Sequence, residues 1–208
     1  GCRQIIDNYT PNIDVDLSWK TTALKNVCSI NSQSKEPKDL FDETFIYIDI
    51  SSVESNTGNI DFTNELNVSN YPSRARRVIN KKDILMSSVR PNLKSFAYID
   101  FEVTNHIAST GFMVLTCDET LINSKFLYFL LFGDFLQNQM ISRMGKGQYP
   151  SINSKDTGEL IIPIPSMETQ KLIVSEIEKE QDIIDGNKLL IKKYTAKIKE
   201  KIDRIWDL

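Results

Sequence analysis

Short apolar runs separated by polar and turn-forming residues fill the chain from Trp19 to Thr116. Such runs, rich in β-branched and aromatic side chains, predict strands. We expect two short strands between Trp19 and Ile30, and further strands at residues 45–50, 84–86, 96–99 and 112–116. The polar stretch 51–70 carries the turn signal Thr57-Gly58-Asn59, so we expect a long surface excursion there.

Residues 126–132 and 135–141 place apolar side chains at helical spacing, and Gly133 separates the two segments. They predict two short helices packed on the sheet. The fold class we expect is therefore α+β, with a twisted, mainly antiparallel sheet, short packed helices and a long C-terminal helix.

A contact loop and a short strand precede that long helix. The loop, residues 145–149, has the sequence GKGQY, and the apolar run 160–164 that follows is interrupted by Pro163 and flanked by Pro165. Since proline cannot donate to a sheet ladder, this strand cannot be central. Ser166 is the expected N-cap of the helix, with Thr169 where a capping box would have Glu or Gln.

The pattern from residue 167 to residue 206 is helical, and isoleucines recur in it at intervals of seven. This stripe must be buried against something. Its members, which we predict to form an interface, are Ile173, Ile177, Ile184, Ile191, Tyr194, Ile198, Ile202 and Ile205.

Two interpretations of Asp185-Gly186-Asn187 are possible. As a turn, it would give a helical hairpin. We favour one continuous helix, because the seven-residue phase continues across Gly186 from Ile184 to Ile191. The glycine then costs about 1 kcal/mol.

Charge is divided along this helix. Residues 176–185 contain five acids and one lysine, and residues 188–204 contain seven bases and two acids. Against an antiparallel copy or relative, each acidic half would meet a basic half, so the stripe predicts an antiparallel coiled coil. The alternative is that the stripe packs on the body of its own chain.

Composition is typical of one ordinary domain with an appendage. The 208 residues are 40% hydrophobic, enough to bury a core. No apolar run is long enough for a bilayer span and no signal peptide is evident, so we expect a cytoplasmic protein. The cysteines Cys2, Cys28 and Cys117 are far apart in sequence and support neither a disulfide framework nor a zinc site.

The net charge of -3 hides a basic block between Ser73 and Ser95, where seven bases accompany one acid, Asp83. Basic side chains beside small polar residues suit phosphate contact. A solvated surface is the equally matched alternative. The candidate DNA-binding residues in this block and in the later loop are Arg74, Arg76, Arg77, Lys81, Lys82, Arg90, Asn92, Lys94, Lys146, Gln148 and Tyr149.

Catalysis is not indicated. The single histidine, His106, has no evident carboxylate or nucleophile partner, and no glycine-rich phosphate loop occurs. The order Asn70-Tyr71-Pro72 differs from the motif that positions an amino group for methyl transfer. We therefore expect no enzymatic activity, no cofactor and no metal.

Several motifs together resemble one family. They are W-x-x-x-x-L-x-x-V at residues 19–27, KKDILMS at 81–87, VRP at 89–91, GKGQYPSIN at 145–153, IPIP at 162–165 and METQKLIV at 167–174. In this order they resemble the specificity subunit of type I restriction-modification systems, as a single target recognition domain followed by its helix. Residues 2–18 are similar to the joint before such a domain in polypeptides fused to an adenine-specific DNA methyltransferase.

The resemblance implies a linker at residues 1–18, a DNA target recognition domain at 19–165 and a helical spacer or dimerisation arm at 166–208. A full specificity subunit has two such domains, held apart by two antiparallel helices that also dock methyltransferase subunits. This chain has one of each. The implied partners are double-stranded DNA, an adenine-specific methyltransferase, and a second copy or another half bound through the helix. The alternative is a protein-interaction or oligomerisation module that does not bind DNA.

Within that role, we assign phosphate contacts to Arg74, Arg77, Lys81, Lys82 and Lys94. Base-edge reading is assigned to Arg76, Arg90, Asn92, Gln148 and Tyr149, because their side chains can reach a groove edge. The bases that they would read depend on loop geometry.

Overall fold

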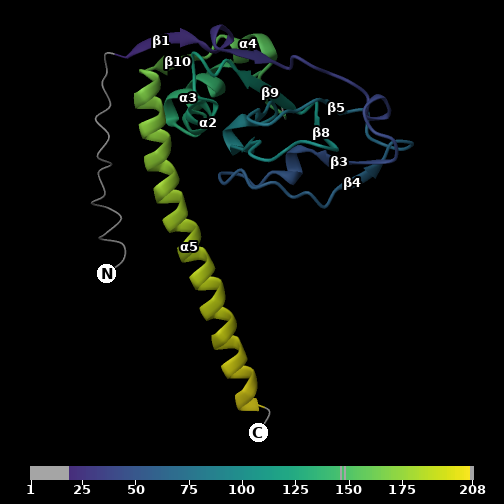
Figure 1. Ribbon diagram of the computed structural model, residues 1–208, viewed down its shortest axis with the longest axis vertical. Coiled ribbons are helices and arrows are strands. Elements are labelled where there is room, and N and C mark those ends of the chain that lie inside the picture. The colour runs from purple at the N-terminus through teal and green to yellow at the C-terminus, as the bar shows by residue number, and fades with distance from the viewer. Residues whose placement is uncertain (1–18, 146, 148, 207–208) are drawn as a thin grey trace. The chain divides into compact units, whose positions relative to one another are not determined.

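The structure, a computed structural model, describes residues 19–145, 147 and 149–206. The expected linker at residues 1–18 lies outside them. The chain divides into two compact units, the first ending at Gln170 and the second starting at Lys171, and each is described by itself. Figure 1 shows that the strands and short helices belong to the first unit.

Strands of the first unit form three sheets. The smallest pairs β1 (Lys20–Ala23) with β10 (Ile161–Ile164). The second has the order β2 (Cys28–Ile30), β9 (Phe112–Cys117), β6 (Ile84–Ser87) and β7 (Phe96–Tyr98). The third has the order β4 (Glu65–Asn67), β3 (Thr44–Ile48), β8 (His106–Ser109) and β5 (Ala75–Arg77). The β3–β8 pair is parallel and the other pairs are antiparallel.

The α+β class and the mainly antiparallel pairing confirm the prediction, while the division into three sheets goes beyond it. Strands β4, β5 and β8 were not expected. We expected residues 51–70 to form a long surface excursion. Part of this stretch instead belongs to the fold, because it contains β4 and the buried Val53. Both β4 and β5 are three residues long, too short to show an alternating pattern.

The core lies between the two four-stranded sheets. One cluster joins Leu85 and Val114 of the second sheet to Ile48 and Ala108 of the third. A smaller cluster on the opposite face of the third sheet is built around Phe45. Because side chains alternate along a strand, β3 supplies both clusters. Strand β6 is buried at every position.

Helices α2 (Ser124–Leu130) and α3 (Asp134–Arg143) confirm the two predicted short helices, with Gly133 at the N-cap of α3. Rings of the α2 region pack on strand β7: Phe132 lies 5.4 Å from Phe96 and Tyr128 lies 5.8 Å from Tyr98, measured between ring centroids. Helix α4 (Ser154–Gly158) was not predicted. Short 3-10 helices occur at η1 (Leu24–Asn26), η2 (Pro37–Asp39), η3 (Ile50–Ser52) and η4 (Pro91–Leu93).

Helix α5 (Met167–Trp206) continues through Gly186, which confirms one helix over the hairpin. The predicted cap also forms, because Thr169 donates its backbone N–H to Ser166 Oγ at 3.1 Å. At 1.5 Å per residue the helix is on the order of 60 Å long. None of the helices within the described residues is long and apolar enough to cross a membrane.

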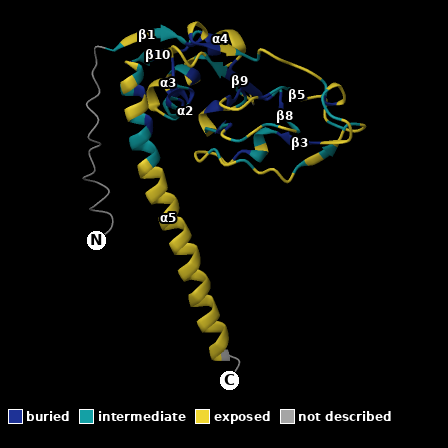
Figure 2. Ribbon diagram, viewed as in Figure 1, coloured by how far each residue is buried: buried dark blue, intermediate teal, exposed yellow. Residues whose placement is uncertain are grey.

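The predicted interface residues of α5 differ in exposure. Ile173 and Ile177 are partly exposed, whereas Ile184, Ile191, Tyr194, Ile198, Ile202 and Ile205 are exposed. Figure 2 shows the long exposed part of the helix, which runs from residue 179 to residue 205. Large apolar side chains are thus left in water over this length.

Candidate nucleic-acid interface

Two loops far apart in sequence are joined by backbone contacts. Arg90 donates its N–H to Pro150 O at 2.8 Å, and Ile152 donates to Ser88 O at 2.9 Å. An isolated antiparallel bridge pairs Val89 with Ser151. The segment that contains η4 and the segment after α3 therefore form one composite surface, which we call the paired loops (residues 88–94, 145, 147 and 149–152).

The turn η4 sits between two residues with left-handed backbone. Arg90 has φ 48° and ψ 53°, and Lys94 has φ 55° and ψ 39°. This region favours glycine, and each non-glycine residue there costs on the order of 1 kcal/mol. Proline at position 91 keeps Arg90 out of the right-handed helical region. Strain on two basic residues of one short turn is typical of a functional site.

Side chains from both loops meet at Arg90 and Tyr149. The guanidinium carbon of Arg90 lies 5.1 Å from the centroid of the Tyr149 ring, a cation–π distance. Tyr149 is 67% exposed, and Asn92 is exposed on the adjoining turn. These three predicted base-reading residues are thus brought together.

Neither segment that builds this surface contains an acid. No Asp or Glu occurs in residues 84–99 or in residues 135–155, which together carry Arg90, Lys94, Arg143, Lys146 and Lys155. The shared absence of acids from these two segments could have indicated this surface from the sequence, whereas the basic block alone did not indicate it. The composite surface suits a phosphate backbone.

Lys94 has a structural contact in addition to its predicted role. Its Nζ donates to Phe132 O, at the end of the α2 region, at 2.9 Å. Its backbone carbonyl accepts from Asn56 N at 3.1 Å. Lys94 therefore fixes the turn against its neighbours.

The predicted residues Lys81 and Lys82 lie at another turn, where each pairs with a carboxylate. Lys81 Nζ lies 2.5 Å from Glu102 Oε1, and Lys82 Nζ lies 3.5 Å from Glu119 Oε2. The carboxylate of Glu102 raises the pKa of Lys81, first through a hydrogen bond and then through its charge. Both pairs are on the surface, so each contributes little to stability.

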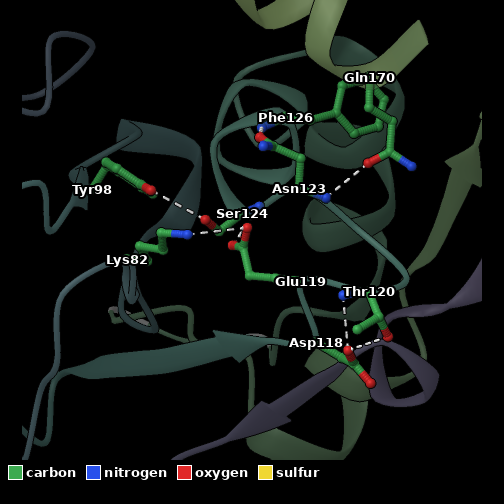
Figure 3. A network of polar contacts seen from close by, with 9 residues as sticks. All are labelled: Lys82, Tyr98, Asp118, Glu119, Thr120, Asn123, Ser124, Phe126 and Gln170. Carbon is green, nitrogen blue, oxygen red and sulfur yellow. Dashed lines mark hydrogen bonds and ion pairs between the residues drawn. The ribbon is translucent and has the colours of Figure 1, made fainter. Parts of the chain in front are cut away.

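Figure 3 shows how Lys82 enters a polar network. Glu119, its partner, also accepts from the backbone N–H of Ser124 at 3.2 Å. Tyr98 OH and Ser124 Oγ lie 3.1 Å apart. The carboxylate that Lys82 would have to leave on binding phosphate thus stabilises the start of α2.

The buried carboxyl of Asp83 organises the same turn. It accepts from Thr116 Oγ1 at 2.6 Å and from Asn80 N at 2.7 Å. Burial raises its pKa, and these hydrogen bonds partly offset that effect. The one acid of the basic block is therefore internal.

Arg74, Arg76 and Arg77 form a third group, around β5. Arg76 pairs with Glu36 at 3.2 Å and donates to Ser73 O at 2.8 Å. Arg77 is partly buried, and burial lowers its pKa. Arg74 is exposed. The three arginines therefore differ from one another in pairing and in exposure.

The remaining predicted residues, Lys146 and Gln148, lie outside the described residues. Their neighbours are held in place, because Gly145 donates its N–H to Ser151 O at 3.1 Å.

The described part of the chain contains no group of three or more His, Cys, Asp or Glu side chains that could hold a metal. Cys28 and Cys117 are distant in sequence but lie opposite one another on β2 and β9, with Sγ atoms 3.1 Å apart, and both are free thiols. A hydrogen bond with Cys28, followed by burial, raises the pKa of the Cys117 thiol.

Comparison with known proteins gives the family. A model described as the type I restriction modification DNA specificity domain matches residues 17–199. The chain is 32% identical over 123 residues to the type I restriction enzyme HindI specificity subunit of Haemophilus influenzae, covering 58% of this chain and 27% of that protein.

Solved structures agree. The chain is similar to the HsdS subunit from Thermoanaerobacter tengcongensis, with a TM-score of 0.72 and 30% identity over 85% of this chain and 45% of that one. A structure from a study of assembly and conformational transition of the type I R-M system gives the same TM-score and identity, over 86% of this chain and 46% of that one. The S subunit from M. genitalium, 14% identical with a TM-score of 0.53, shares the fold.

The chain spans less than half the length of each of these relatives. The family model nevertheless matches most of its length, including the paired loops and the greater part of α5. This chain belongs to the type I restriction modification DNA specificity domain family.

Proposed function

We propose that this chain is a non-catalytic module that recognises a short DNA sequence and places a target adenine within reach of a partner methyltransferase. Its membership of a DNA specificity domain family supports this role. The observation that carries it is the joining of the paired loops, because this brings together two segments that contain Arg90, Asn92 and Tyr149 and no acid.

Roles within the surface follow from side-chain chemistry. Arg90 and Asn92 have donor groups suited to base edges in the major groove, and Tyr149 has a ring that can lie beside a base or sugar. Arg76 and Gln148 remain predicted readers. Phosphate contacts are assigned to Arg74, Arg77, Lys81, Lys82 and Lys94. Lys81 and Lys82 would first have to leave Glu102 and Glu119, so we expect each to contribute less than Arg90.

Helix α5 is proposed as the assembly element. Its exposed isoleucine stripe needs a cover, and its acidic and basic halves match an antiparallel copy. The chain spans less than half of its relatives' length. Pairing with a second copy or another half-subunit would bring two recognition domains into one assembly. The methyltransferase, as subunit or fused domain, would bind the same assembly.

Binding to duplex DNA tests the proposal. A labelled random-sequence duplex is titrated at two salt concentrations, with and without the adenine-specific methyltransferase. Neutralising several phosphates predicts affinity that falls steeply as salt rises, with a slope of about -0.9 per contact. A module that only binds proteins would show no appreciable DNA affinity at either salt, even with the methyltransferase present.

Matched variants localise the binding. Arg90→Gln removes a charge from the paired loops, and Lys38→Gln removes one from a lysine that pairs with Glu36 and belongs to neither loop. The proposal predicts a large loss of affinity for Arg90→Gln and little change for Lys38→Gln. Equal losses would mean that binding follows net charge and not this surface.

A further inference from the structure

The backbone of η4 determines which side chains of the turn face outward. Pro91 is buried and Lys94 Nζ is held to Phe132 O, whereas Asn92 and Leu93 are exposed. The inward side of the turn is therefore occupied, and Asn92 and Leu93 face away from it.

Leu93 is 51% exposed at this position. Its backbone is fixed, since its N–H donates to Arg90 O at 2.8 Å and the next N–H, of Lys94, donates to Pro91 O at 2.9 Å. A single exposed leucine is ordinary on a protein surface. Here, however, it follows the exposed Asn92, on a turn flanked by two residues with left-handed backbone.

We propose that Leu93 is a specificity-determining residue that packs against the 5-methyl group of a thymine in the major groove. This inference rests on the proposed function. In the major groove thymine alone of the four ordinary bases presents a methyl group, so an apolar side chain among polar ones reads that base. Asn92, next to it, has the amide that pairs with N6 and N7 of adenine. The two side chains together fit an A·T pair.

The charge around Leu93 favours DNA over a protein partner. No acid occurs between Asp83 and Asp100 in sequence, and both Arg90 and Lys94 flank the leucine. A docking site for an apolar protein surface would gain nothing from the neighbouring Arg90 cation, because that cation would lose its water on burial. A phosphate beside a groove would pair with it.

The experiment uses the whole chain and its own selected DNA. A random duplex pool is first enriched on the wild-type protein and sequenced, which tests the proposed function. Each thymine of the enriched site is then replaced by uracil, which lacks only the methyl group. One replacement is expected to weaken wild-type binding about fourfold, the ratio for losing one buried methyl-sized group.

Leu93→Ala should bind the thymine and uracil duplexes with the same, reduced affinity. Leu121→Ala is the matched control, because Leu121 is similarly exposed at 46% but lies before α2; it should keep the fourfold preference. Thermal melting checks that both variants stay folded, as expected for exposed positions.

The outcomes are distinct. Loss of the thymine preference in Leu93→Ala alone supports the proposal. An enriched site at which no uracil replacement weakens the wild type, or at which Leu93→Ala keeps the preference, overturns it and leaves the proposed function intact. If no sequence is enriched at all, the proposed function fails and this inference with it.

Discussion

The guanidinium of Arg90 lies over the ring of Tyr149, although the two residues come from separate loops. Their contact is supported by the Arg90 N–H bonded to Pro150 O. The charge is thus held in one orientation before any ligand arrives, which reduces the entropy lost on binding.

Removing the ring tests this arrangement. Tyr149→Ala should weaken DNA binding about two- to fivefold, the loss expected for an exposed cation–π contact of about 0.5–1 kcal/mol. Tyr149→Phe keeps the ring and should bind within about twofold of wild type. Urea midpoints should not change, because Tyr149 is exposed. Equal binding by the alanine variant would show that the ring does not position Arg90.

Lys81 should contribute to DNA affinity whatever the base sequence of the duplex. Lys81→Met is expected to weaken all duplexes evenly and to reduce the salt slope by about 1. Glu102→Gln is the companion variant: it frees Lys81 from its carboxylate, so affinity should rise. A change in the preferred sequence with either variant would instead place Lys81 at a base edge.

Gln170 is expected to stabilise the first unit. It is 1% exposed; Oε1 accepts from Asn123 N at 2.8 Å and Nε2 donates to Pro165 O at 3.0 Å. Figure 3 shows the first of these bonds, at the N-cap residue of α2. Gln170→Ala leaves buried backbone groups without partners and should cost about 1–3 kcal/mol in urea unfolding.

The exposed Gln181, on the same helix, gives the control. It bonds only to Asp185 among its described contacts, at 3.1 Å. Gln181→Ala should change the free energy of unfolding by less than about 0.5 kcal/mol. Comparable losses at both positions would refute the assigned role of Gln170.

His106 makes stability depend on pH. Its ring lies 4.9 Å from Phe101 and 5.6 Å from Phe62, between centroids. Burial lowers its pKa from the ordinary value of 6.5. The unfolded chain therefore binds more protons than the native one, and stability rises with pH. This contribution to the free energy of unfolding is fully present above the pKa of His106 in the unfolded chain, and it is lost as the pH falls below about 6.5.

The measurement compares wild type with His106→Phe in urea unfolding across this range. The raised pKa of Asp83 acts in the opposite direction, because its native carboxyl binds protons more readily. Both proteins contain Asp83, so the difference between their curves isolates His106. Parallel curves would show that the imidazole does not titrate on unfolding.

Pairing through α5 is tested by light scattering over a range of concentrations. Ile198→Glu places a charge in the exposed stripe and should weaken association at least tenfold, since burial of such a side chain is worth about 1.5–3 kcal/mol. Ala196→Glu adds the same charge about 200° away around the helix. It should associate like wild type, and equal loss would point to charge alone.

The parts of the fold that could be predicted are those with strong periodicity. Strand β6 has a continuous apolar run, and α5 keeps its phase through Gly186. Strands β5 and β8 escaped prediction because pairing with distant strands creates them: β8 lies between β3 and β5. Strand β5 mixes charged and apolar residues and β8 mixes polar and apolar ones, so local propensity gave no signal.

The candidate site could be predicted by residue type but not by arrangement. A block of basic residues says nothing of which ones meet a carboxylate across the fold, as Arg76 meets Glu36. Nor does it say that the loop at 149 pairs with the turn at 90. These contacts depend on tertiary pairing, which places Val89 beside Ser151.

The two left-handed residues that flank η4 also limit how the turn can vary. Arg90 and Lys94 fix its path together with Pro91, whereas Asn92 and Leu93 carry none of the side-chain bonds that hold it in the described structure. Those two side chains can then be exchanged while the backbone stays put. The backbone of the turn would stay the same while its two outward side chains vary. If the turn reads DNA as proposed, a change of DNA preference would require as few as two substitutions.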